Sequence, residues 1–162
     1  MPADYFAADD LEASIRVGFL DGQDVGRRHA PGMQPKLLDN SAGRDMLSAL
    51  NHELKLADRF EISVAFVTLG GLQRLRAELT RLGLTDEVRG TIVTSDYLGF
   101  NDPKVFTDLL NLREYGIRTY IYRGKGYHPK GYLFHRAAGV TAFLGSSNLT
   151  QNALNGNVEW NL

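Results

Sequence analysis

The chain has 162 residues, 43% of them hydrophobic, and a formal net charge of −1. This size and apolar content suit one compact α/β domain that spans residues 1–162. The absence of cysteine excludes a disulfide framework and a zinc site with thiolate ligands. The first residues do not form a secretory signal and no apolar run approaches the roughly 18 residues that span a bilayer, so we expect a cytoplasmic protein without a membrane partner.

Charge is distributed unevenly along the chain. Residues 1–24 carry six acidic side chains against the single Arg16, and residues 113–136 carry six basic side chains against the single Glu114. The basic residues are Arg113, Arg118, Arg123, Lys125, Lys130 and Arg136. This stretch favours a polyanionic partner, although basic residues also commonly decorate solvated strand ends.

The N-terminal third is predicted to contain two helices. Leu11, Ile15 and Phe19 recur at helical spacing, which indicates an acidic helix over residues 9–20. Residues 21–43 are rich in glycine and proline and are predicted to form an irregular connection. We expect residues 1–43 to pack on the domain, followed by a second helix over 44–57.

The middle of the chain alternates between strand and helix patterns. Strands are predicted at residues 61–67, 90–94 and 117–122, and helices at residues 72–82 and 105–112. Such alternation favours right-handed crossovers and parallel pairing. Shorter strands are predicted at 131–134, 141–144 and 158–160, with antiparallel or mixed pairing. The expected fold is α/β, with a mixed, largely parallel sheet flanked by helices.

Polar side chains that suit phosphate chemistry gather in the C-terminal third. Side chains alternate between the faces of a strand, so His128 and Lys130 are predicted to point the same way, as are Ser146 and Asn148. An imidazole, an ammonium, a hydroxyl and an amide together can bind a phosphate and attack it. Each also has an ordinary explanation: a structural histidine, a helix cap, or, for Glu159, a surface carboxylate.

The combination of these residues resembles the phospholipase D superfamily. Its elements are His128-Pro129-Lys130, then Gly145-Ser146-Ser147-Asn148, then Glu159 eleven positions beyond the asparagine. The chain is most similar to single-motif members of the superfamily, which include small bacterial nucleases. Residues 35–38 and 62–66, with the C-terminal residues, also resemble the phospholipase D-like domain fused to superfamily 2 helicases in bacteria. We therefore expect a phospholipase D-like half-unit that is a fragment of a longer multidomain protein with a helicase-type ATPase.

The resemblance implies a role for each of these residues. His128 would attack phosphorus and form a phosphohistidine, and Glu159 would hydrogen-bond its other ring nitrogen. Lys130, Ser146 and Asn148 would hold the non-bridging oxygens. Residues expected to bind substrate are Ser147, Arg123 and Lys125. No metal or cofactor is implied.

One position departs from the family pattern. The family's motif aspartate would fall at position 135, where this chain has His135. The similar single-motif endonucleases also lack this aspartate. The departure leaves two functions open: a metal-independent DNA nuclease, or a catalytically idle nucleic-acid-binding or dimerisation module of a larger helicase. A phospholipase is disfavoured, because no amphipathic membrane-facing helix is predicted.

The chain contains only one copy of the motif. In the family, a second motif histidine protonates the leaving group. A homodimer in which two copies of His128 face each other would supply it.

Overall fold

The computed structural model describes residues 36–96 and 102–162. Residues Leu38–Asn161 form a compact unit that contains every described helix and strand. The predicted helix over residues 9–20, and most of the irregular connection after it, lie outside the described residues.

The described residues contain five strands in one mixed sheet. The strands are β1 (Arg59–Val64), β2 (Thr85–Ser95), β3 (Tyr115–Tyr122), β4 (Lys130–Arg136) and β5 (Gly139–Leu144), and their order is β3-β2-β1-β4-β5. The pairs β1–β2 and β2–β3 are parallel, and the pairs β1–β4 and β4–β5 are antiparallel. The predicted mixed α/β fold is confirmed.

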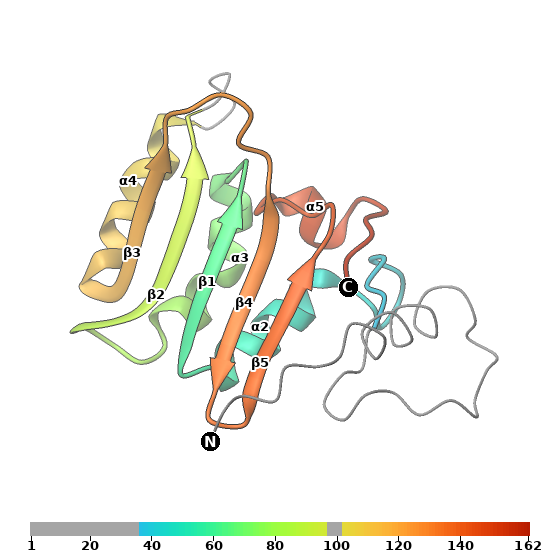
Figure 1. The fold of residues 1–162 in the computed structure, drawn as a ribbon, viewed down its shortest axis with the longest axis horizontal. Coiled ribbons are helices and arrows are strands. Elements are labelled where there is room, and N and C mark those ends of the chain that lie inside the picture. Colours follow the sequence, from blue (N-terminus) through green and yellow to red (C-terminus); the bar gives the residue numbers. More distant parts are fainter. Residues whose placement is uncertain (1–35, 97–101) are drawn as a thin grey trace, which may run out of the picture. The chain divides into compact units, whose positions relative to one another are not determined.

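Four described α-helices lie behind the sheet in the view of Figure 1. They are α2 (Met46–Leu56), α3 (Leu69–Thr80), α4 (Pro103–Asn111) and α5 (Gln151–Asn155), and the 3-10 turn η2 (Leu112–Glu114) follows α4. Helices α2, α3 and α5 contact one another. No helix in the described part of the chain is long and apolar enough to cross a membrane.

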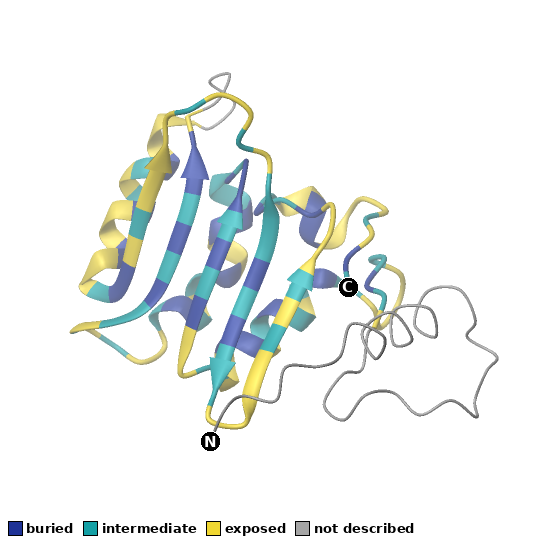
Figure 2. Cartoon of the chain, in the orientation of Figure 1, coloured by how far each residue is buried: buried dark blue, intermediate teal, exposed yellow. Residues whose placement is uncertain are grey.

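The core lies between the helices and one face of the sheet. Alternate strand residues such as Ile62, Ile92 and Phe134 are buried there, as a period of two requires. Residues between them, including Ser63 and Val93, are half-buried, and Tyr120 is exposed (Figure 2). The second face of the sheet is therefore less covered than the first.

Side-chain caps fix where the helices begin. Asp45 accepts a hydrogen bond from the Ser48 backbone N–H at α2, and Thr68 accepts one from Gly71 at α3. At α4, Asp102 accepts one from Lys104, and Pro103 occupies the first turn, where its missing N–H costs nothing. Each helix thus starts within a few residues of its predicted position.

One predicted strand is wrong. Residues 158–160 form no strand, and Val158 and Trp160 are exposed at 82% and 67%. The segment is attached instead through Asn161, which forms isolated bridges with Leu38 and Gly145. Apolar side chains suggested a strand there, but they point into solvent, where burial cannot stabilise one.

Candidate active site

The backbone that continues the central strand β1 brings the two motif segments together. The N–H of Ala65 donates to the carbonyl of Pro129 (3.1 Å), and the N–H of Thr68 donates to the carbonyl of Leu149 (3.0 Å). Val67 and Leu149 form a parallel bridge. Residues 65–68 therefore lie between the His-x-Lys segment and the Ser-x-Asn turn.

His128 and Lys130 contact each other directly. The Lys130 Nζ lies 2.7 Å from His128 Nδ1 and 3.1 Å from the His128 carbonyl oxygen. An ammonium can only donate, so the neutral tautomer with its lone pair on Nδ1 is the one that accepts a hydrogen bond from Lys130. The ring of Phe66 stands nearly perpendicular to that of His128, with centroids 5.8 Å apart. His128 is exposed, and its neutral ring is the form that can act as a nucleophile.

The Lys130 ammonium experiences two opposing influences. Partial burial lowers its pKa, and the nearby Glu159 carboxylate acts in the opposite direction. Glu159 also contributes to the raised pKa of Tyr132, although burial of that phenol is the larger cause. The carboxylate of Glu159 therefore acts electrostatically on groups of β4.

Ser146 connects the turn to the C-terminal segment. Its hydroxyl donates to Glu159 Oε2 and accepts a hydrogen bond from the N–H of Trp160 (3.0 Å). A Cβ at the neighbouring Gly145 would lie 2.1 Å from the Trp160 carbonyl oxygen, so only glycine permits this approach. Glu159 also lies within 3.5 Å of Asn157 Nδ2. Ser146 and Asn157 are the hydrogen-bond partners of the Glu159 carboxylate within the described chain. The hydrogen bond of Glu159 with His128 stays a prediction.

Asn148 is oriented by the backbone of the β1 extension. Its Oδ1 accepts a hydrogen bond from the N–H of Phe66 (3.1 Å). This contact fixes the amide so that its NH₂ group, which has no partner among residues 36–96 and 102–162, can donate to a ligand.

Ser147 has surroundings unlike those of Ser146. It is 0% exposed; its hydroxyl donates to the Ala153 carbonyl and accepts from Asn161 Nδ2 (2.9 Å). Its N–H donates to Asn161 Oδ1 (3.1 Å), and its carbonyl accepts from the Tyr132 hydroxyl. Ser147 was expected to bind substrate, whereas all of these contacts are with the protein and hold the turn in place.

The remaining predicted residues lie outside this cluster. Arg123 and Lys125 are exposed in the loop between β3 and β4. His135 pairs in register with Arg59, at the opposite end of β4 from Lys130, and its Nε2 lies 3.5 Å from Glu61 Oε1. His135 is therefore separate from the motif cluster.

Sequence reasoning missed two residues that shape the site. Phe66 contacts the His128 ring and also orients Asn148 through its backbone, and Asn161 holds the Ser147 turn. The sequence carried no signal for either role, because both depend on contacts between segments that lie far apart in the chain.

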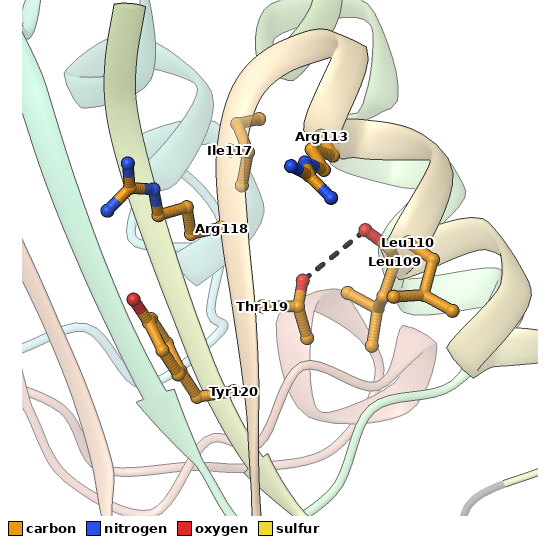
Figure 3. Close-up of a pocket in the computed structure, with 7 residues that line it drawn as sticks. All are labelled: Leu109, Leu110, Arg113, Ile117, Arg118, Thr119 and Tyr120. Atoms are coloured by element: carbon orange, nitrogen blue, oxygen red, sulfur yellow. Dashed lines mark hydrogen bonds between the residues drawn. The ribbon is translucent and has the colours of Figure 1, made fainter.

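A separate pocket of about 350 Å³ lies beside β3. Leu109, Leu110 and Arg113 line it from α4 and η2, and residues 117–120 line it from β3 (Figure 3). The Thr119 hydroxyl donates to the Leu109 carbonyl at 3.3 Å. Arg118 and Tyr120 point to the other side of the strand in this view. None of the motif residues lines this pocket.

The fold and the motif cluster together define a phospholipase D-like domain. The family model described as "Cardiolipin synthase, PLD-like domain" matches residues 52–162, and the chain therefore belongs to this family within the phospholipase D superfamily. Among solved structures, NucT from Helicobacter pylori is similar, with a TM-score of 0.56 and 17% sequence identity over 78% of this chain and 81% of that one. No curated protein sequence matches significantly.

Proposed function

We propose that this domain is a metal-independent phosphodiesterase that cleaves DNA through a phosphohistidine intermediate. The observation that carries the proposal is the cluster of His128, Lys130 and Asn148 around the β1 extension. A nucleophile lies there beside one cationic donor and one amide donor. Family membership supports the phosphodiesterase class.

The chemistry begins with attack of a His128 ring nitrogen on phosphorus. A P–N bond forms as the P–O bond to the leaving strand breaks, and the leaving oxygen takes a proton from an acid. Lys130 and the Asn148 amide donate to the non-bridging oxygens as negative charge develops on them. The Ser146 hydroxyl donates to Glu159 in this structure, and it would have to turn to the phosphate when substrate binds in order to donate to a non-bridging oxygen. Water then cleaves the P–N bond and restores His128.

The choice of DNA as substrate has two supports. The exposed Arg123 and Lys125 follow β3 and precede His128, so cations for a phosphate backbone lie close to the nucleophile along the chain. The name of NucT identifies a nuclease with a similar fold. We extend the proposal to a helicase-linked protein, on the resemblance of the motif segments to helicase-fused domains.

The deciding experiment measures cleavage of labelled single- and double-stranded DNA in excess chelator. Wild-type protein cuts, His128→Ala loses about 10³-fold or more of the rate, and His135→Ala retains most of it. Rapid quenching traps a phosphorus label on the protein that acid removes, as expected for phosphohistidine. A strict requirement for magnesium or zinc would contradict the mechanism.

A second candidate is a nucleic-acid-binding module without catalysis. It is favoured by His135, which occupies the position of the family aspartate and pairs with Glu61 instead of the motif cluster. In that case DNA binds with an affinity that depends on Lys130, and neither wild type nor any variant cleaves it.

A further inference from the structure

Two tyrosines form a stacked pair next to the motif. The rings of Tyr122 and Tyr127 have centroids 4.8 Å apart and an interplanar angle of 23°. Tyr122 is the last residue of β3 and Tyr127 directly precedes His128. One tyrosine of the pair is therefore the immediate sequence neighbour of the proposed nucleophile.

A hydrogen bond holds one ring of the pair, and the loop leaves room for the other. The Tyr127 hydroxyl hydrogen-bonds Ser63 Oγ on β1 at 2.8 Å. An ideal Cβ at Gly124 would lie 2.4 Å from the far end of the Tyr122 side chain, so a larger residue there would push the ring out of its stacked position. A preorganised aromatic pair loses little conformational entropy when a ligand stacks on it.

The pair is accessible and lies among cations. Tyr122 is 45% exposed although it is a large aromatic residue. Arg123 and Lys125, in the loop between the two tyrosines, are exposed and form no ion pair within the described ranges 36–96 and 102–162. Aromatic faces beside unpaired cations are the combination that binds single-stranded nucleic acid, through base stacking and phosphate contacts.

We propose that the Tyr122–Tyr127 pair is a base-stacking subsite that selects unpaired nucleotides of DNA next to the scissile phosphate. This inference rests on the proposed function and specifies its substrate. The bases of a duplex are already stacked on their neighbours, so an intact double helix cannot place a base on the pair without unstacking it. Single strands are therefore bound and cut in preference to duplexes.

Binding is measured with a His128→Ala protein, which leaves the strand uncut, in excess chelator. The probes are a fluorescent thymidine oligonucleotide and an abasic oligonucleotide of the same length. Tyr122→Ala weakens binding of the thymidine strand about tenfold and leaves the abasic strand unchanged, because only a base can stack. Tyr122→Phe, which keeps the ring, binds as the parent does. Gly124→Ala displaces the ring without removing it and weakens thymidine binding as well.

Tyr120→Ala is the matched control. Tyr120 is 52% exposed, lies two residues before Tyr122 on the same strand face, and has no stacking partner among the described residues. Equal losses for Tyr120→Ala and Tyr122→Ala, or equal losses on thymidine and abasic strands, overturn the subsite and leave the proposed function intact. Wild-type cleavage of DNA, assayed in parallel, tests the proposed function alone. Failure of the protein to bind either oligonucleotide rejects both the stacking subsite and the proposed function.

Discussion

Two adjacent serines of the candidate active site have opposite surroundings. Ser146 is exposed and donates to Glu159, whereas Ser147 is buried and bonded to Ala153 and Asn161. Alanine removes the same hydroxyl group from each serine. The two variants therefore separate an effect on the cleavage rate from an effect on the free energy of unfolding.

Ser146→Ala is expected to lower the cleavage rate by about 100-fold with little change in the free energy of unfolding, because it removes a donor at the reacting phosphate. Ser147→Ala leaves the buried Asn161 Nδ2 without a partner and removes one of the two donors to the Ala153 carbonyl, the other being Asn40 Nδ2. We expect it to lower the free energy of unfolding by about 1–3 kcal/mol. Rate assays and denaturant titrations of both variants test this. The reverse pattern would mean that the roles of the two serines are exchanged.

The charge of Glu159 is expected to affect the alkaline limit of activity. Burial lowers the Lys130 pKa, and the Glu159 carboxylate opposes that shift. Glu159→Gln removes the opposing charge, so the Lys130 pKa falls further and its ammonium is lost at lower pH. The alkaline limb of kcat/KM that reports loss of the Lys130 ammonium, above the pH range in which motif imidazoles titrate, should therefore move to lower pH. Glu61→Gln, a carboxylate beside His135, is the control and should leave the limb in place.

At the scale of elements, the position of one glycine controls how the C-terminal segment meets the sheet. A Cβ at Gly145 would lie 2.1 Å from the Trp160 carbonyl oxygen, while one at Gly131 would have Leu144 Cδ2 as its nearest contact at 3.4 Å. Gly145→Ala should cost about 1–3 kcal/mol of unfolding free energy and also displace Glu159 and lower activity. Gly131→Ala, equally close to the motif in sequence, should stay within about 1 kcal/mol of wild type. Equal free energies of unfolding for Gly145→Ala and Gly131→Ala would show that the C-terminal segment moves to accommodate the added methyl group.

The sequence was sufficient for elements whose burial is periodic. Apolar stripes predicted α2, α3 and α4, and apolar runs predicted β1 and β3. In each of these elements the buried residues recur at the spacing of one secondary structure, helix or strand. The start of β2 was missed, since Thr85–Glu87 are polar, Asp86 and Glu87 are exposed, and Thr85 pairs with β3 across a register shift. Strand alternation predicted that His128 and Lys130 point the same way, and the two side chains are in contact, although His128 precedes β4 and does not belong to the strand. The contributions of Phe66 and Asn161 were not predicted, because they depend on contacts between distant segments.

At the scale of the whole molecule, one chain supplies one motif histidine. The proposed mechanism needs a nucleophile and an acid, and His135 lies at the wrong end of β4 to serve as the acid. We therefore propose a two-fold dimer whose motif histidines face each other. Two such imidazoles titrate as a coupled pair, which predicts a bell-shaped pH profile.

Mixing wild-type and His128→Ala protomers tests this arrangement. Heterodimers should be nearly inactive, because each composite site lacks either its nucleophile or its acid. Heterodimers that keep about half of the wild-type rate would mean that each chain works alone. The same mixture prepared with His135→Ala is the control and should remain active.

The extension of β1 between the two motif segments also has a consequence for biosynthesis. Its partners lie more than 60 residues later in the chain, at Pro129 and Leu149, and Ser146 meets Trp160 later still. During translation, His128 and Lys130 therefore emerge before Asn148 and the Ser146–Glu159 pair. A nascent chain that ends between these segments carries the imidazole without the Asn148 amide donor, so we expect the proposed site to be complete only after synthesis has passed residue 161.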